Sequence, residues 1–226
     1  MKRVRAVEAL SRLLARQQDG AKGSLVWETD ARFFSENIVS ALDNTTMRLF
    51  VGIPLPAVVI EELSAISARL RCSGDGLRWT APESWHITVR FLGNTSQEQY
   101  ECIVARLREL QLRSVPVELE ELGCFDRAGV LFAGVRVSSE LILVQKRVAT
   151  ATAICGFVLE ARPYQPHITL ARSKGQRTGL REVKARILHQ PKFTSFIAGE
   201  LLLYESFLGA GGSRYEVRER FALNGG

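Results

Sequence analysis

The alternation of hydrophobic and polar positions changes character near residue 47. Before this point, residues 4–16 have the periodicity of one short helix, and the stretch from residue 17 to residue 46 is mostly polar. From Met47 to Ile53 most positions are apolar, which is typical of a buried strand. We therefore expect residues 1–46 to be a loosely ordered N-terminal extension and residues 47–226 to form the folded part of the chain.

Within the folded part, the same order of elements occurs twice. Each copy is predicted to contain a strand, a helix and a second strand: 49–52, 57–71 and the strand around His86, and then 131–134, 140–155 and the strand around His167. Gly52 precedes His86 by 34 residues, and Gly134 precedes His167 by 33 residues. An internal repeat of this kind decides the architecture. Its pseudo-two-fold symmetry predicts that the two histidine-bearing strands meet at one cleft.

The repeat and the remaining elements predict an α+β protein with two pseudo-symmetric lobes, from a duplication of about 47–95 and 128–175. Each lobe is expected to be an antiparallel-rich sheet with helices on its outer side, and the active cleft is expected between the lobes. The elements outside the repeat are a helix that begins in a Thr95–Glu98 capping box and runs to about 110, an edge strand at 115–122, a short helix at 179–189, and strands at 193–207 and 215–223.

Two of the three histidines are followed two positions later by a threonine. On a strand, residues i and i+2 point to the same face, so each motif presents an imidazole and a hydroxyl together. The two motifs are His86, Ile87, Thr88, Val89 and His167, Ile168, Thr169, Leu170. Two imidazoles can divide the roles of base and acid, and hydroxyls can hold phosphate oxygens. One motif alone would be a structural His–Thr pair, but duplication at matched spacing favours acid–base chemistry on a phosphate.

The composition indicates which ligands and which cellular compartment fit this chemistry. The net charge is +6, and the planar guanidinium of arginine suits phosphate oxygens. No stretch approaches the roughly 18 apolar residues of a transmembrane helix. The cysteines at positions 72, 102, 124 and 155 lack Cys-x-x-Cys spacing, so we expect reduced, mostly core cysteines in a cytoplasmic protein. Neither motif has further ligands at a recognisable spacing, so we expect no metal and no cofactor.

The residues around the motifs are similar to those of a known family. The resemblance is to the 2H phosphoesterase superfamily, and within it to the bacterial RNA 2′,3′-cyclic phosphodiesterase branch, formerly named 2′-5′ RNA ligase. The segments that carry it are Met47–Ile53, Arg78–Trp79, Thr88–Gly93 and Arg162–Arg172. It covers Met47 to about Leu223 and leaves residues 1–46 without a counterpart. It implies hydrolysis of RNA 2′,3′-cyclic phosphate ends to 2′-phosphomonoesters without a metal.

The resemblance also implies roles for the motif residues. His86 would donate a proton to the departing ribose 3′-oxygen, and His167 would accept a proton from the attacking water. Thr88 and Thr169 would bind the non-bridging oxygens and stabilise the developing charge. The sequence alone is symmetric between the histidines, so this assignment of acid and base rests on the resemblance.

Four further residues are candidate substrate contacts: Arg172, Tyr164, Phe91 and Trp79. Arg172 lies five positions after His167, so it reaches the phosphate only if the strand bends or ends before it. The three aromatic residues are candidates to stack on a terminal base, with a core position as the alternative for Trp79. His189 lacks the threonine and is expected at a helix end.

The expected partners are RNA ends or small cyclic nucleotides that carry a 2′,3′-cyclic phosphate. We expect a monomer that has no contact with membranes. Two other functions stay open from the sequence. The same residues could join RNA ends by a 2′-5′ linkage, with an RNA 5′-hydroxyl in place of water, or the site could bind RNA ends without turnover.

Overall fold

The computed structural model describes residues 46–173, 178–187, 190–209 and 212–224. The predicted N-terminal extension, with its helix at 4–16, lies outside these residues except for Thr46, and so does His189.

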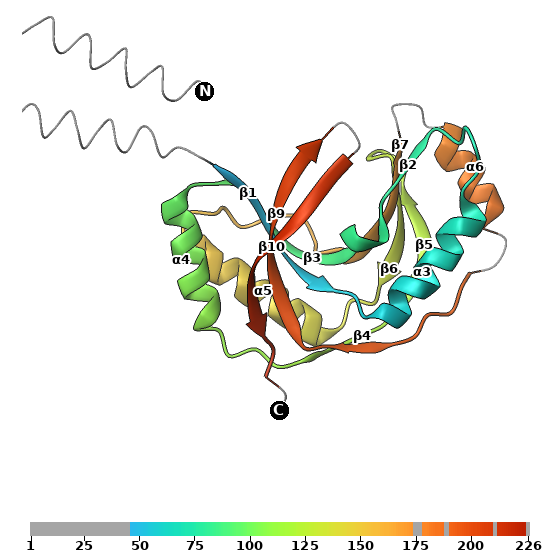
Figure 1. Cartoon of the computed structure of the whole chain (residues 1–226). Coiled ribbons are helices and arrows are strands. Elements are labelled where there is room, and N and C mark those ends of the chain that lie inside the picture. Colours follow the sequence, from blue (N-terminus) through green and yellow to red (C-terminus); the bar gives the residue numbers. More distant parts are fainter. Residues whose placement is uncertain (1–45, 174–177, 188–189, 210–211, 225–226) are drawn as a thin grey trace, which may run out of the picture. The chain divides into compact units, whose positions relative to one another are not determined.

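Two four-stranded antiparallel sheets form the framework of the folded part (Figure 1). The first has the order β10-β9-β1-β3 and consists of β1 (Met47–Pro54), β3 (His86–Thr95), β9 (Glu200–Gly209) and β10 (Gly212–Ala222). The second has the order β2-β7-β6-β5 and consists of β2 (Leu77–Trp79), β5 (Leu119–Phe125), β6 (Val130–Val135) and β7 (His167–Ser173). The predicted α+β class is confirmed.

Two of the helices cover the sheet of the opposite repeat: α5 (Ser139–Ala153) lies on the first sheet and α3 (Ala57–Leu70) lies on the second (Figure 1). The other described helices are α4 (Gln97–Arg108) and α6 (Thr178–Arg186), with the 3-10 turn η1 (Pro82–Ser84). The second repeat supplies α5, which packs on β3 of the first sheet and on α4. The first repeat supplies α3, whose Ile66 and Leu70 share a small pocket with Leu122 of β5. Each repeat therefore places its helix on the sheet of the other.

Hydrophobic burial fixes the register of the two motif strands. Ile87 and Ile168, the residues between the histidine and the threonine of each motif, are both 0% exposed. They belong to one continuous hydrophobic core that includes residues of both sheets. Burying a side chain of this size contributes about 1.5–3 kcal/mol. A slip of one position would move each isoleucine to the cleft side, so burial of the isoleucines keeps the histidines facing the cleft.

The helix predicted from a Thr95–Glu98 capping box begins one residue later. The Ser96 side chain accepts a hydrogen bond from the Gln99 backbone N–H at 3.2 Å, and the Gln99 side chain accepts one from the Ser96 N–H at 3.1 Å. Thr95 instead ends β3, is fully buried and donates to the Gly93 carbonyl. Both tetrapeptides fit the capping-box pattern, and the burial of Thr95 selects the second.

Two predicted strands are interrupted. The segment at 115–122 forms β4 (Val115–Val117) and the start of β5, and β4 leaves the main sheets to pair with β8 (Phe196–Ala198). The segment at 193–207 likewise forms β8 and most of β9, separated at Gly199. Each break marks the point at which the chain changes sheets.

A disulfide contradicts the expectation that the cysteines are reduced. It joins Cys102 of α4 to Cys155, just beyond α5, with the two Cα atoms 5.8 Å apart. Cys72 and Cys124 are free. The pair is 53 positions apart in the sequence. Only the packing of α4 on α5 brings the two residues together, so spacing along the chain could not reveal the pair.

Candidate active site

Both motif histidines and both motif threonines line one cleft of ≈ 380 Å³. His86 is the first residue of β3 and His167 is the first residue of β7. The two strands belong to different sheets, so the cleft lies between the two repeats, as the duplication predicted.

The tautomer of each histidine follows from its backbone contact. His86 Nδ1 lies 2.8 Å from the Ser84 carbonyl oxygen, and His167 Nδ1 lies 2.8 Å from the Gln165 carbonyl oxygen. A carbonyl can only accept, so each Nδ1 carries a hydrogen and each neutral ring has its lone pair on Nε2. His86 Nε2 lies 3.1 Å from the Thr88 hydroxyl. Each ring is thus fixed by the carbonyl two positions before it.

Aromatic rings pack around both histidines. The centroid of the His86 ring lies 4.6 Å from that of Phe50 and 5.1 Å from that of Tyr215. The centroid of the His167 ring lies 5.0 Å from that of Phe125 and 5.5 Å from that of Phe132. Phe50 and Phe132 occupy the same place in the repeated Leu-Phe-x-Gly segments, so the sequence repeat becomes a repeated aromatic wall.

Burial lowers the pKa of both histidines. Desolvation lowers the pKa of His86 from 6.5 to about 4; the Ser84 hydrogen bond opposes this shift, and the nearby His167 and Arg172 charges add to it. Burial likewise lowers the pKa of His167, with the Gln165 bond opposing and Arg172 adding. Both imidazoles are therefore neutral at pH 7 in the free protein, and each can accept a proton.

A β-bulge lies three residues after each histidine. The pairing of β3 with β1 skips Val89, and the pairing of β7 with β6 skips Leu170. An extra residue shifts the alternation of faces, so two consecutive residues are buried in each strand. The fifth position after each histidine then returns to the cleft face. Arg172 and Phe91 occupy these equivalent positions, and both line the cleft.

Glycine at position 52 permits the close approach of His86. A Cβ atom at this position would lie 3.3 Å from His86 Cδ2, 3.3 Å from Tyr204 Cε2 and 3.1 Å from the Ile87 carbonyl oxygen. These distances are tighter than ordinary van der Waals contact. The glycine that ends the first Leu-Phe-x-Gly segment therefore has a steric role at the site.

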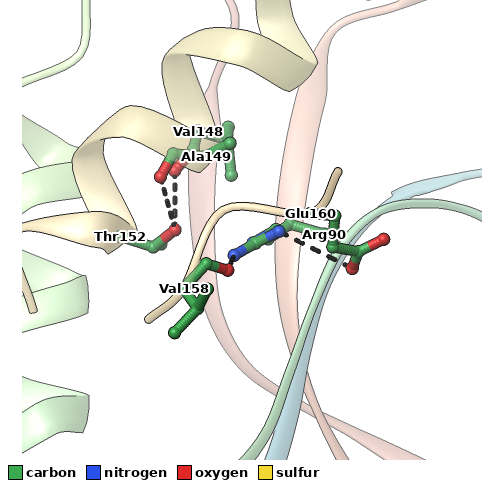
Figure 2. A network of polar contacts seen from close by, with 6 residues as sticks. All are labelled: Arg90, Val148, Ala149, Thr152, Val158 and Glu160. Carbon is green, nitrogen blue, oxygen red and sulfur yellow. Dashed lines mark hydrogen bonds and ion pairs between the residues drawn. The ribbon is translucent and has the colours of Figure 1, made fainter. Parts of the chain in front are cut away.

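Two side chains, Arg90 and Tyr164, tie the first motif strand to the segment that leads into the second motif. Arg90 of β3 is 3% exposed, donates to the Val158 carbonyl oxygen, and lies 3.6 Å from a Glu160 carboxylate oxygen (Figure 2). Tyr164 donates to the Thr88 carbonyl oxygen at 2.9 Å. All three contacts join residues of β3 to the 158–164 segment, which precedes His167 by a few residues. They fix the approach of the second motif relative to the first.

The other predicted substrate contacts are placed differently. Tyr164 is half-buried and lines a groove beside the cleft, and burial raises the pKa of its hydroxyl. Trp79 does not line the cleft. Its indole donates to Asp75 at 2.9 Å, the Arg71 guanidinium lies 5.4 Å from its ring centroid, and its ring packs on the core. Trp79 therefore takes the alternative that was expected for it, a position against the hydrophobic core.

Three neighbours of the cleft were absent from the sequence prediction: Arg90, Tyr204 and Tyr215. Tyr204 and Tyr215 come from β9 and β10, and they reach His86 because β9 pairs with β1. That pairing joins segments about 150 positions apart and leaves no local signal in the sequence. Regular alternation from His86 and Thr88 would place Arg90 on the cleft face, whereas the bulge at Val89 turns it into the core, so its buried contacts could not be found without the bulge.

The described part of the chain gives no sign of a metal centre or of a membrane span. No group of three or more His, Cys, Asp or Glu side chains there could hold a metal ion. No helix among the described residues is long and apolar enough to cross a membrane.

Comparison with known proteins agrees with the two-motif site. The model of the LigT-like phosphoesterase family matches residues 53–132 and 135–215, and each matched segment contains one histidine motif. The chain belongs to this family. Membership in the family accounts for the paired motifs, and it makes this chain a phosphoesterase-fold enzyme with two related halves.

Relatives within the family cover most of the folded part. An RNA 2′,3′-cyclic phosphodiesterase from Methanocaldococcus jannaschii is 29% identical over 176 residues, which are 76% of this chain and 98% of the relative. One from Escherichia coli is 28% identical over 178 residues, which are 78% of this chain and 96% of the relative. The crystal structure of E. coli LigT in apo form aligns with a TM-score of 0.68 at 28% identity, covering 79% of this chain and 98% of that chain.

Proposed function

We propose that this chain hydrolyses RNA 2′,3′-cyclic phosphodiester ends to 2′-phosphomonoesters by metal-independent acid–base catalysis. The observation that carries the proposal is the pair of imidazoles in one cleft, each with Nδ1 hydrogen-bonded to a carbonyl oxygen, so that the lone pair of the neutral ring is on Nε2. Relatives at 28–29% identity are named RNA 2′,3′-cyclic phosphodiesterase, and a solved structure of E. coli LigT holds 3′-AMP. RNA ends and small cyclic nucleotides are therefore the proposed substrates.

Each histidine performs one proton transfer: His167 accepts a proton and His86 donates one. His167 Nε2 takes a proton from water as the water oxygen forms a bond to phosphorus. The bond from phosphorus to the ribose 3′-oxygen breaks, and His86 gives its proton to that oxygen. The product keeps the phosphate on the 2′-oxygen, and the protons exchange with solvent before the next turnover.

Hydroxyl and guanidinium donors stabilise the charge on phosphate. Thr88 and Thr169 lie on the cleft face beside their histidines, and Arg172 reaches the same cleft through the bulge at Leu170. Such donors are most effective when they are already positioned before the reaction. The bound phosphate anion also supplies a negative charge next to His86, which opposes the low pKa of this residue and favours its protonated form.

A turnover assay in EDTA tests the proposal. The substrate is an oligoribonucleotide with a terminal 2′,3′-cyclic phosphate, and the product is resolved as 2′- or 3′-phosphate. We expect 2′-phosphate product in EDTA, and a fall in kcat of at least about 100-fold for His86→Ala and for His167→Ala. His189→Ala is the matched control and keeps wild-type activity.

The alternatives give different products. Tight binding without turnover would identify a non-catalytic RNA-end binding protein and would overturn the proposal. A second RNA with a free 5′-hydroxyl, added to the same mixture, detects 2′-5′ ligation as a longer product.

A further inference from the structure

A second groove continues from the catalytic cleft on the side of His167. It has a volume of ≈ 840 Å³ and shares Thr88, Phe91 and His167 with the cleft. Its other walls are the turn between β5 and β6, the 160–165 segment and Gln145 of α5. We name it the arginine groove and define it by Phe91, Phe125, Arg127, Arg162, Tyr164 and Gln165. Because its mouth includes a catalytic histidine, a substrate longer than one nucleotide can occupy both.

The charges in the arginine groove favour an anionic ligand. Arg127 and Arg162 are exposed, and no ion pair joins either of them to a carboxylate within the described part of the chain. The two carboxylates that line the groove have cationic neighbours instead. Asp126 binds Lys184 at 2.7 and 2.9 Å, and Glu160 lies 3.6 Å from Arg90. The free positive charge of the groove therefore belongs to the two arginines.

Aromatic surface lies between these charges and the cleft. Phe91 is 60% exposed although it is a large apolar side chain, and it lines both spaces. Phe125 and Tyr164 add partly exposed ring surface to the groove wall. Grooves for single-stranded RNA combine cations that follow the phosphates with aromatic faces on which bases stack. The arginine groove has both features.

We infer that the arginine groove binds the RNA strand on the 5′ side of the cyclic phosphate, and that oligonucleotide ends are therefore preferred to mononucleotides. This inference rests on the proposed function of the cleft. The cleft alone, at ≈ 380 Å³, is near the lower end of the volumes of small-molecule sites, which are about 300–1,000 Å³. It holds the terminal nucleotide, and the preceding phosphates contact Arg127 and Arg162.

The test compares substrates of increasing length. Adenosine 2′,3′-cyclic phosphate is compared with di- and trinucleotides that end in the same group. For the wild-type protein, kcat/KM rises with length. In Arg127→Glu/Arg162→Glu, kcat/KM for the trinucleotide falls by about tenfold or more, and kcat/KM for the mononucleotide stays within about twofold. Unchanged mononucleotide turnover also shows that the variant is folded.

Control variants separate a local effect from a general change in charge. Arg113→Glu reverses an exposed arginine that lines neither the cleft nor the groove, and it leaves the length dependence intact. Arg48→Glu reverses an exposed arginine on another wall of the cleft. If Arg48→Glu abolishes the length dependence and the groove variant does not, the RNA leaves by that wall and the inference is wrong. A wild-type kcat/KM that does not depend on length also overturns it.

Binding provides a readout that does not depend on turnover. In the His86→Ala/His167→Ala background, a labelled trinucleotide with a terminal 3′-phosphate binds with a Kd that rises with salt. When Arg127→Glu/Arg162→Glu is added to this background, the slope of log Kd against log salt falls by about 0.7 for each phosphate that loses its contact with an arginine. If no substrate is hydrolysed but this slope falls, the proposed function fails and the RNA groove stands. If the slope is unchanged, the groove inference fails.

Discussion

The two motif histidines are alike in sequence but differ in surroundings. His86 packs against Phe50, Tyr204 and Tyr215, and burial lowers its pKa to about 4. His167 packs against Phe125 and Phe132, and its pKa is lowered as well. The fold thus stabilises the neutral form of both rings. In the proposed mechanism, the roles of acid and base are then separated by the substrate, whose phosphate anion favours a proton on one of the two rings.

The lowered pKa values make stability depend on pH. The unfolded chain protonates His86 near pH 6.5, whereas the folded chain protonates it only near pH 4, so the unfolded state binds more protons between these values. Stability is complete above pH 6.5 and falls as the pH drops toward 4. Protonation of His86 over this pH range lowers the free energy of unfolding by about 3 kcal/mol, and protonation of His167 acts in the same direction.

Urea unfolding at several values between pH 4 and pH 7 measures this effect. His86→Gln removes the titrating group, so its unfolding free energy should depend less steeply on pH over the same range. Equal pH dependence of the wild-type protein and this variant would show that His86 titrates normally in the folded state.

At the scale of elements, the sequence predicted the repeated strand–helix–strand order because the apolar periodicity is local. The helices expected at 57–71 and 140–155 are observed as α3 and α5, within a few residues at their ends. The errors occur where tertiary packing decides. Because Thr95 is buried, the capping box begins one residue later than the sequence predicted. The Cys102–Cys155 pair depends on the packing of two helices.

In the candidate site, too, the features that depend on local alternation were predictable, and those that depend on strand pairing were not. Motif residues separated by two positions share a face on any strand, so His86 with Thr88 and His167 with Thr169 followed from the sequence. Arg172 needed a change of face that only the bulge at Leu170 supplies. The equivalent bulge at Val89 turns Arg90 inward, and alternation could not predict this. A repeated bulge is therefore part of the duplicated unit, although it leaves no clear pattern in the sequence.

A substitution of Arg90 tests whether the bulge at Val89, by turning this residue inward, helps to position the segment that leads to His167. The Nε and Nη1 atoms of Arg90 are buried without a hydrogen bond, so the charge is costly to bury. Arg90→Met keeps the volume and removes the charge, and the melting temperature should change by only a few degrees. The variant can no longer bind Val158 or Glu160, so the approach to His167 loosens and kcat should fall by about tenfold or more.

Thermal melts and steady-state kinetics on the same preparations separate the two effects. Arg106→Met, an exposed arginine paired with Glu109 on α4, is the matched control and should change neither quantity. A loss of stability in proportion to the loss of kcat would assign Arg90 to the fold alone.

At the scale of the folded part, the two repeats are interlocked. The helix of each repeat covers the sheet of the other, and β2, from the first half, pairs with β7 of the second sheet. Neither sheet can therefore be completed by its own repeat. This exchange holds the two histidine strands in a fixed relation, which a cleft between independent lobes would not achieve.

The disulfide adds a covalent link on the helical side of this arrangement. It joins α4 to the end of α5, and neither cysteine lines the cleft or the arginine groove. A cross-link that closes a loop of 53 positions restricts the unfolded chain. Such restriction typically stabilises a protein by about 2–4 kcal/mol. The bond should therefore affect stability and leave catalysis unchanged.

Cys102→Ser/Cys155→Ser measures this contribution. We expect its free energy of unfolding in urea to be about 2–4 kcal/mol lower than that of the oxidised wild-type protein, with kcat unchanged. Addition of a reductant should bring the wild-type protein to the level of the variant, whereas Cys72→Ser, at an exposed free cysteine, should retain the full response. If reductant leaves the unfolding of the wild-type protein unchanged, the two thiols are reduced in the folded chain. The interlocked helices would then hold α4 against α5 without a covalent bond.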